Sequence, residues 1–235
     1  MRGDSCLSVN KSGVTFFKNC QSGFTLLEMA VVMVVLGLLI GGSLIPLSIQ
    51  MEKKDRDSTG RQLEDIREAL IGFALSNGRL PCPDVDGDGV GDGAVTCSNA
   101  EGDFPWVDMG LGQIDAWGQA FTYRASSNFA DASDGTGCSA STPGISFSLC
   151  SAGSITVLDG AGGNPVALLL PAIVISHGKN WATTSSADEA ENTDGDSVFI
   201  DRIYSSNSAS TFDDLLIWVP PHVLKSKMVS AALLP

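Results

Sequence analysis

Basic residues, histidine and tyrosine are scarce in this chain of 235 residues. Lys and Arg together number 14 against 27 acidic residues, and there are only 2 Tyr and 2 His. The formal net charge of −13 excludes a general affinity for nucleic acid phosphates or for anionic lipid. The length suits one sizeable globular domain with an appendage.

Motifs of nucleophilic and nucleotide-dependent catalysis are also lacking. The sequence contains no G-x-S-x-G, no P-loop and no G-x-G-x-x-G. His177 precedes a turn, and neither it nor His222 lies in a marked catalytic context. We therefore expect no enzymatic activity, no catalytic residue and no required cofactor.

One long apolar run stands out near the N-terminus. Residues 24–45, FTLLEMAVVMVVLGLLIGGSLI, are apolar on every helical face and carry a single charge, Glu28. A helix of this length spans roughly 30 Å, the thickness of a bilayer core. We expect a single-pass transmembrane helix here.

The charges on either side of the run predict its orientation. Residues 1–23 carry three basic side chains against one acidic one, whereas residues 46–235 are strongly acidic. The positive-inside bias places the leader in the cytoplasm and residues 46–235 on the other side of the membrane.

The junction before the run carries a processing motif. GFTLLE, residues 23–28, resembles the processing site of type IV prepilins and type II secretion pseudopilins, with Gly23, Phe24 and Glu28 matching. The resemblance implies that prepilin peptidase cuts after Gly23, removes the leader 1–23 and methylates the Phe24 amine. It also implies an inner-membrane protein with a periplasmic head, which then joins a periplasmic or cell-surface filament.

Glu28 has two interpretations. A carboxylate in a bilayer span is costly and needs a partner. The carboxylate could stay within its own chain at the helix N-terminus, where negative charge is favoured. The resemblance implies instead a pair with the Phe24 amine of a neighbouring subunit, which sets the register during assembly.

Beyond the span, residues 46–79 should continue the helix, which Pro46 is expected to kink or interrupt. Apolar residues at helical spacing need a partner surface: Leu63, Ile66, Leu70, Phe73 and Ala74. The helix should end near Asn77-Gly78.

Residues 80–235 read as a turn-rich head with short strands, so the fold class is α+β, a long helix followed by a mostly antiparallel sheet. The strand candidates are Ala120–Arg124, Ile145–Leu149, Ser154–Leu158, Val166–Ser176, Ser197–Ile200 and Leu215–Val219, with a helix at Val223–Leu234. This is also the type IV pilin architecture. Residues 115–123, DAWGQAFTY, resemble the D-P-W-G-x-P-Y-x-Y motif of secretion pseudopilins, with alanine at both proline positions. We assign them a structural role as a turn, an aromatic anchor and a strand.

Four cysteines lie in the exported part, where thiols are oxidised: Cys82, Cys97, Cys138 and Cys150. Two disulfides have three possible connectivities. We favour sequential pairing, Cys82 with Cys97 and Cys138 with Cys150. A zinc site is the rival, but no C-x₂₋₄-C spacing supports it.

Two acidic segments are candidates for calcium. Asp84, Asp86, Asp88 and Asp92 fit positions 1, 3, 5 and 9 of an EF-hand-type loop, although Val95 replaces the glutamate of position 12. The alternative is a flexible acidic loop without an ion. The second segment, residues 187–197, contains Asp188, Glu189, Glu191, Asp194 and Asp196 at irregular spacing. Secretion pseudopilins carry calcium in a C-terminal loop of this kind.

Together these features predict a structural subunit, a minor pilin or pseudopilin of a type IV pilus or type II secretion filament. Its expected partners are other pilin subunits, prepilin peptidase, the inner-membrane assembly platform and membrane lipid, and nucleic acid is not expected. The alternative is a tip adhesin or ligand-binding pilin.

Overall fold

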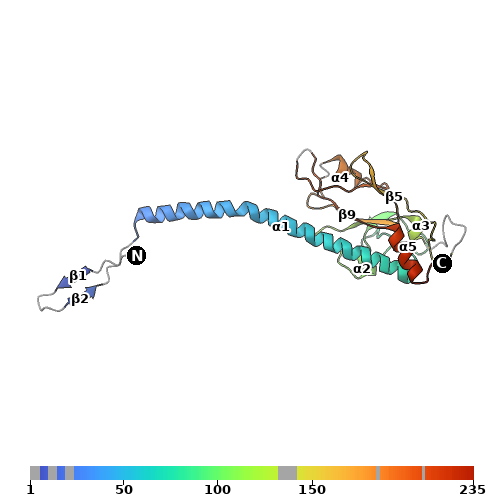
Figure 1. The fold of residues 1–235 in the computed structure, drawn as a ribbon, viewed down its shortest axis with the longest axis horizontal. Coiled ribbons are helices and arrows are strands. Elements are labelled where there is room, and N and C mark those ends of the chain that lie inside the picture. Colours follow the sequence, from blue (N-terminus) through green and yellow to red (C-terminus); the bar gives the residue numbers. More distant parts are fainter. Residues whose placement is uncertain (1–5, 10–14, 19–23, 132–141, 184–185, 208–209) are drawn as a thin grey trace. The chain divides into compact units, whose positions relative to one another are not determined.

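The structure, a computed structural model, describes residues 6–9, 15–18, 24–131, 142–183, 186–207 and 210–235, with the backbone alone for residues 6–9, 15–18 and 41–47. The chain divides into two compact units, Met1–Met51 and Glu52–Pro235. Figure 1 shows the elements of both units.

The first unit contains a hairpin and the beginning of a long helix. Strands β1 (Cys6–Val9) and β2 (Thr15–Lys18) pair antiparallel. Helix α1 (Leu26–Asn77) starts in this unit and passes through Pro46 without a break in its helical backbone. The expected interruption at Pro46 was therefore wrong, because the flanking turns hold the helix across the one hydrogen bond that proline cannot donate.

The second unit begins with the remainder of α1, which ends as predicted at Asn77. Gly78 follows with a φ of 70°, and its N–H donates to the Ala74 carbonyl at 2.8 Å. The left-handed conformation explains the glycine at this helix end. The buried face of the helix consists of Leu63, Ile66, Leu70, Ile71 and Ala74. Ile71 takes the place that we assigned to Phe73, which is only half-buried.

Two sheets form the rest of the second unit. The first has the order β3-β4-β7-β9 and is antiparallel throughout; its strands are Glu101–Asp103, Thr122–Ala125, Ala172–Ser176 and Leu215–Val219. The second has the order β6-β5-β8, from Pro165–Leu170, Ile155–Leu158 and Val198–Ile200, and only β5 and β8 run parallel. The short helices are α2 (Trp106–Met109), α3 (Ser127–Ala130), α4 (Ala187–Glu191) and α5 (Pro221–Ser230). The fold is α+β, as predicted.

Strand β7 lies at the centre of the packing and is buried on both faces. Ala172 and Val174 belong to the core that α1 and α5 share, whereas Ile173 and Ile175 pack with β5, β6 and β8. This alternation follows from the two-residue period of a strand. The first sheet is thereby covered by helices on one face and by the second sheet on the other.

Two strand predictions were wrong. Residues 145–149 form no strand, although Ile145 and Phe147 are buried. The Ser146 N–H donates to the Gly78 carbonyl at the end of α1, and not to a neighbouring strand. The alternating pattern therefore buries apolar side chains here without forming a strand. Residues 166–176 form two strands, β6 and β7, because the backbone turns at Leu169, where φ is 56°.

The structural role of the 115–123 segment is confirmed. The Asp115 carboxylate accepts hydrogen bonds from the N–H groups of Trp117 and Gln119, both at 2.9 Å. Gly118 has a φ of 84°, a conformation that glycine adopts readily. The segment is thus a side-chain-stabilised turn that leads into β4 and places Tyr123 in the core.

Candidate functional sites

Thr25 caps the first turn of α1. The Glu28 N–H donates to the Thr25 hydroxyl at 3.2 Å, and the Met29 N–H donates to the Thr25 carbonyl at 3.2 Å. Phe24, the residue before this cap, is 77% exposed. Gly23, the other half of the predicted cleavage site, lies outside the described residues. The described half of the junction is therefore accessible and leads directly into a capped helix.

The role of Thr25 could have been read from the sequence, because Thr25-x-x-Glu28 is a capping-box pattern. Only the threonine half of the pattern is realised. The exposed Glu28 carboxylate forms no hydrogen bond or ion pair within the described part of the chain. Thr25 thus satisfies the helix N-terminus and leaves the Glu28 carboxylate available to another partner.

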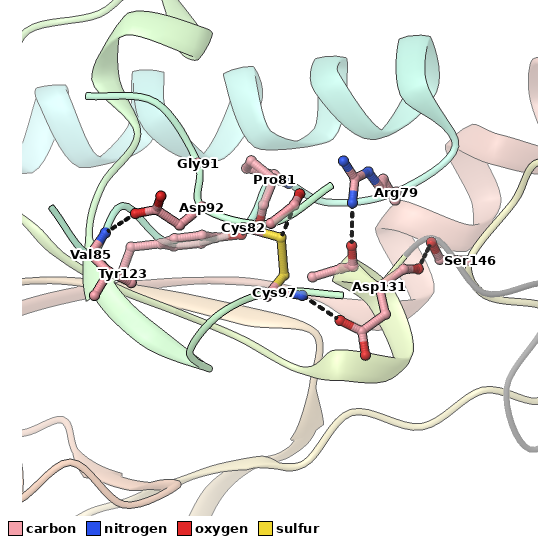
Figure 2. Close-up of a disulfide and its surroundings, with 12 residues drawn as sticks. Arg79, Pro81, Cys82, Val85, Gly91, Asp92, Cys97, Tyr123, Asp131 and Ser146 are labelled. Atoms are coloured by element: carbon pink, nitrogen blue, oxygen red, sulfur yellow. Dashed lines mark hydrogen bonds between the residues drawn. A yellow bond between two sulfur atoms is a disulfide. The ribbon is translucent and has the colours of Figure 1, made fainter. Parts of the chain in front are cut away.

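The predicted Cys82–Cys97 disulfide is present and closes the first acidic segment at its base (Figure 2). The bridge joins residues 15 apart in sequence, with Cα atoms 5.2 Å apart. Beside Cys82, the Pro81 carbonyl accepts a hydrogen bond at 3.0 Å from the hydroxyl of the fully buried Tyr123. Burial raises the pKa of Tyr123, so this hydroxyl keeps its proton. On the other side, the Cys97 N–H donates to Asp131 at 3.0 Å, so both ends of the loop are anchored to the core.

The second predicted disulfide is only half described. Cys150 is disulfide-bonded. Cys138, the partner that we predict for it, lies outside the described residues. The pairing of these two cysteines therefore stays a prediction.

Asp84 organises the acidic loop from a buried position. One of its carboxylate oxygens accepts the Gly87 N–H and the other accepts the Gly89 N–H, each at 2.7 Å. Gly89 has a φ of 87°, and a side chain there would collide with Trp106. The glycine is thus required both for the turn and for the close approach of α2.

Three of the four predicted calcium ligands converge. Oxygens of Asp84, Asp86 and Asp88 all lie within 4.8 Å of one another. Asp92 is outside this group, because its carboxylate accepts the Val85 N–H at 2.6 Å. Asp108 of α2 accepts the Gly91 N–H at 2.9 Å and brings a further carboxylate to the loop. An oxygen-only set of this kind suits a hard cation such as Ca²⁺.

Comparison with known families matches the N-terminal part of the chain. Residues 18–44 match the prokaryotic N-terminal methylation motif. The chain has a prepilin-type N-terminus. This motif is the hallmark of type IV pilins and pseudopilins, and it covers Gly23, Phe24 and Glu28. No curated protein and no solved structure matches the chain significantly.

The motif bears on the other predictions to different degrees. It supports a subunit similar to pilins and pseudopilins. It does not confirm the membrane span: among the described residues, no helix is both long and apolar enough to cross a bilayer. The span at residues 24–45 therefore stays a prediction.

The second acidic segment divides into two parts. Oxygens of Glu191, Asp194 and Asp196 lie within 4.8 Å of one another. Glu189 is instead buried inside the head, and Asp188 pairs with Arg202. Only three of its five acidic residues could therefore share an ion.

Proposed function

We propose that the protein is a minor pilin or pseudopilin that is cleaved after Gly23, methylated on Phe24 and assembled into a filament through its N-terminal helix. The match of residues 18–44 to the methylation motif carries this proposal. Residues 24–45 would anchor the precursor in the inner membrane, with the head in the periplasm. Prepilin peptidase, the assembly platform and other pilin subunits would be its partners.

The geometry of the first helical turn supports a role for Glu28 in assembly. Its N–H is satisfied by Thr25, and its carboxylate has no partner within the described residues. Cleavage would create a positive amine on Phe24 of every subunit. A carboxylate in an apolar setting gains most from a charged partner, so a Glu28 carboxylate paired with the Phe24 amine of a neighbour would fix the axial position.

N-terminal mass spectrometry tests the processing step. The mature protein, from membranes of a host with prepilin peptidase, should begin at methylated Phe24. Gly23→Val should block cleavage, because a branched side chain replaces the smallest residue at the scissile bond. Val14→Ala, in the leader but away from the junction, is the control and should leave cleavage intact. A mature protein that starts elsewhere would overturn the proposal.

Co-assembly tests the step that follows. Glu28→Ala should be inserted and cleaved normally but incorporated poorly into filaments, since the amine loses a charged partner worth a few kcal/mol in an apolar setting. Glu64→Ala removes an exposed carboxylate from the same helix and serves as the matched control. Equal incorporation of both variants would contradict the role of Glu28.

We further propose that the acidic loop holds calcium through Asp84, Asp86 and Asp88. Their convergence supports this, and Asp92 or Asp108 could complete the set after a small movement. Without a bidentate carboxylate at position 12, the affinity should lie on the order of 10⁻⁴–10⁻³ M, as in extracellular modules. The ion would stabilise the loop rather than take part in a reaction.

The alternative function is that of a tip adhesin or ligand-binding pilin. One observation favours it: the head contains a small pocket that combines two buried carboxylates with an exposed tryptophan. Both functions use the same N-terminus, so binding by the head would add to assembly rather than replace it.

A further inference from the structure

A pocket lies where the loop after β7 meets α4 and the start of β9. It contains about 170 Å³ of space, part of it open to solvent. Glu189 and Asp214 provide its buried carboxyl groups and His177 a partly buried imidazole, whereas Trp181, Thr183 and Thr193 form its exposed parts. Its enclosed part has room for about one water-sized group, so the pocket suits the end of a single small group.

Three side chains of the lining donate hydrogen bonds to other groups. The Thr183 hydroxyl donates to the Asn180 carbonyl at 3.2 Å, and the Thr193 hydroxyl donates to the Ala190 carbonyl at 3.0 Å. The side-chain amide of Asn180 donates to Glu189 at 3.1 Å. The two hydroxyl groups consequently offer the pocket lone pairs rather than hydrogens.

Two polar atoms face each other in the lining without a hydrogen bond between them. His177 Nε2 bonds the Thr122 hydroxyl at 2.9 Å, whereas His177 Nδ1 is buried and has no hydrogen-bond partner among the described residues. Its nearest carboxylate atom is Asp214 Oδ1, at 3.9 Å, too far for a hydrogen bond. His177 Nδ1 thus lacks a hydrogen-bond partner among the described residues, whichever ring nitrogen carries the proton. Asp214 Oδ2 accepts from Asn192 at 2.7 Å, which leaves Oδ1 toward the histidine.

Asp214 brings a buried carboxyl group to the pocket. The Asp214 side chain is only 3% exposed, and its burial, with the charges of Glu189 and Asp213, raises its pKa to about 7. Within the described ranges, no lysine or arginine pairs with Asp213 or Asp214. Lys179 lies beside Glu52 instead. The lining is thus rich in acceptors and negative charge.

We propose that this pocket binds the primary ammonium group at the end of an alkyl chain, as a lysine side chain presents it. Such a group supplies three N–H donors and a positive charge to Asp214 Oδ1, and it can also donate to His177 Nδ1 in the tautomer that carries its proton on Nε2. The exposed Trp181 can cover the alkyl stem and attract the cation through its ring face. The proposal does not depend on filament assembly.

Two other cations fit less well. Groups of three acidic or histidine side chains that converge within 4.8 Å occur in the described chain only at Asp84–Asp88 and Glu191–Asp196, so a metal ion would find too few ligands here. An ethanolamine headgroup carries a negatively charged phosphate, which the carboxylates of Glu189 and Asp214 would repel. Charge therefore favours a lysine side chain over a lipid headgroup.

The test uses the full chain in detergent micelles and the indole N–H signals of its four tryptophans in ¹H–¹⁵N spectra. The probe is n-propylamine, titrated at a pH of about 8, where the amine is charged and Asp214 is ionised. We expect a saturable shift confined to Trp181 and no shift with n-propanol, which has the same shape without the charge. Nα-acetyl-lysine amide should bind more tightly than phosphoethanolamine.

Asp214→Asn provides the decisive variant. Its amide has the shape of the carboxyl group and can still accept from Asn192 through oxygen, so the fold should be kept. We expect the affinity for propylamine to fall at least about tenfold, the equivalent of one hydrogen bond to a charged group. Asp65→Asn, an exposed residue on α1 with the same charge change, should bind normally. No shift in the wild type, an equal shift with propanol, or unchanged binding by Asp214→Asn would overturn the proposal.

Discussion

The buried Asp214 carboxyl predicts an unusual dependence of stability on pH. Its pKa lies at about 7 in the folded state, against 3.8 for an unperturbed aspartate, because burial disfavours the ionised form. Between these values the folded state binds more protons than the unfolded state, so stability falls as the pH rises. The folded state is therefore penalised most above pH 7, where the buried carboxyl must ionise.

The size of this penalty follows from the difference between the two pKa values. Each pH unit corresponds to about 1.4 kcal/mol, so full ionisation of Asp214 costs on the order of 4 kcal/mol. Asp214→Asn abolishes the ionisation and retains the contact with Asn192. Relative to the wild type, the variant should gain stability steadily from about pH 4 to about pH 7.

Urea unfolding of the full chain in micelles, followed by tryptophan emission at several pH values, measures this difference. Other groups contribute to both proteins: Asp213 also has a raised pKa and His177 a lowered one, each because of burial. The effect of Asp214 is thus the difference between the unfolding free energies of wild type and variant at each pH, and not the pH dependence of either protein by itself. Parallel pH profiles for the two proteins would refute the reasoning.

Two further predictions concern the acidic loop. Replacing both Cys82 and Cys97 by serine should destabilise the head by about 3 kcal/mol, the chain-entropy value for a 15-residue loop. Reducing agent should then lower the stability of this variant less than that of the wild type, and an equal loss in both proteins would contradict this. Millimolar calcium should raise the melting temperature of the wild type by mass action. Replacing Asp86 and Asp88 together by alanine should remove this increase. The melting temperature without calcium should change little, because both side chains are exposed. An identical calcium shift in the double variant would move the site to the Glu191–Asp196 group.

The sequence alone determined the N-terminal motif and the end of the long helix. The prepilin-type motif around Gly23 is a short linear pattern, and the helix end at Asn77 follows from a glycine that local geometry requires. The Cys82–Cys97 pairing was likewise within reach, because a short loop favours sequential bridges. Local signals of this kind act over one or two helical turns or a single loop, so no knowledge of packing is required.

Tertiary structure alone decided the arrangement of the head. Residues 145–149 alternate like a strand, yet no neighbour pairs with them, and 166–176 divides into two strands in different sheets. The pocket is the clearest case, because His177 follows β7, Glu189 lies in α4 and Asp214 precedes β9, and the three carry no shared motif. Whether a carboxyl loses its water, and which acceptors face one another, depends on contacts between distant segments. Local sequence patterns do not encode those contacts.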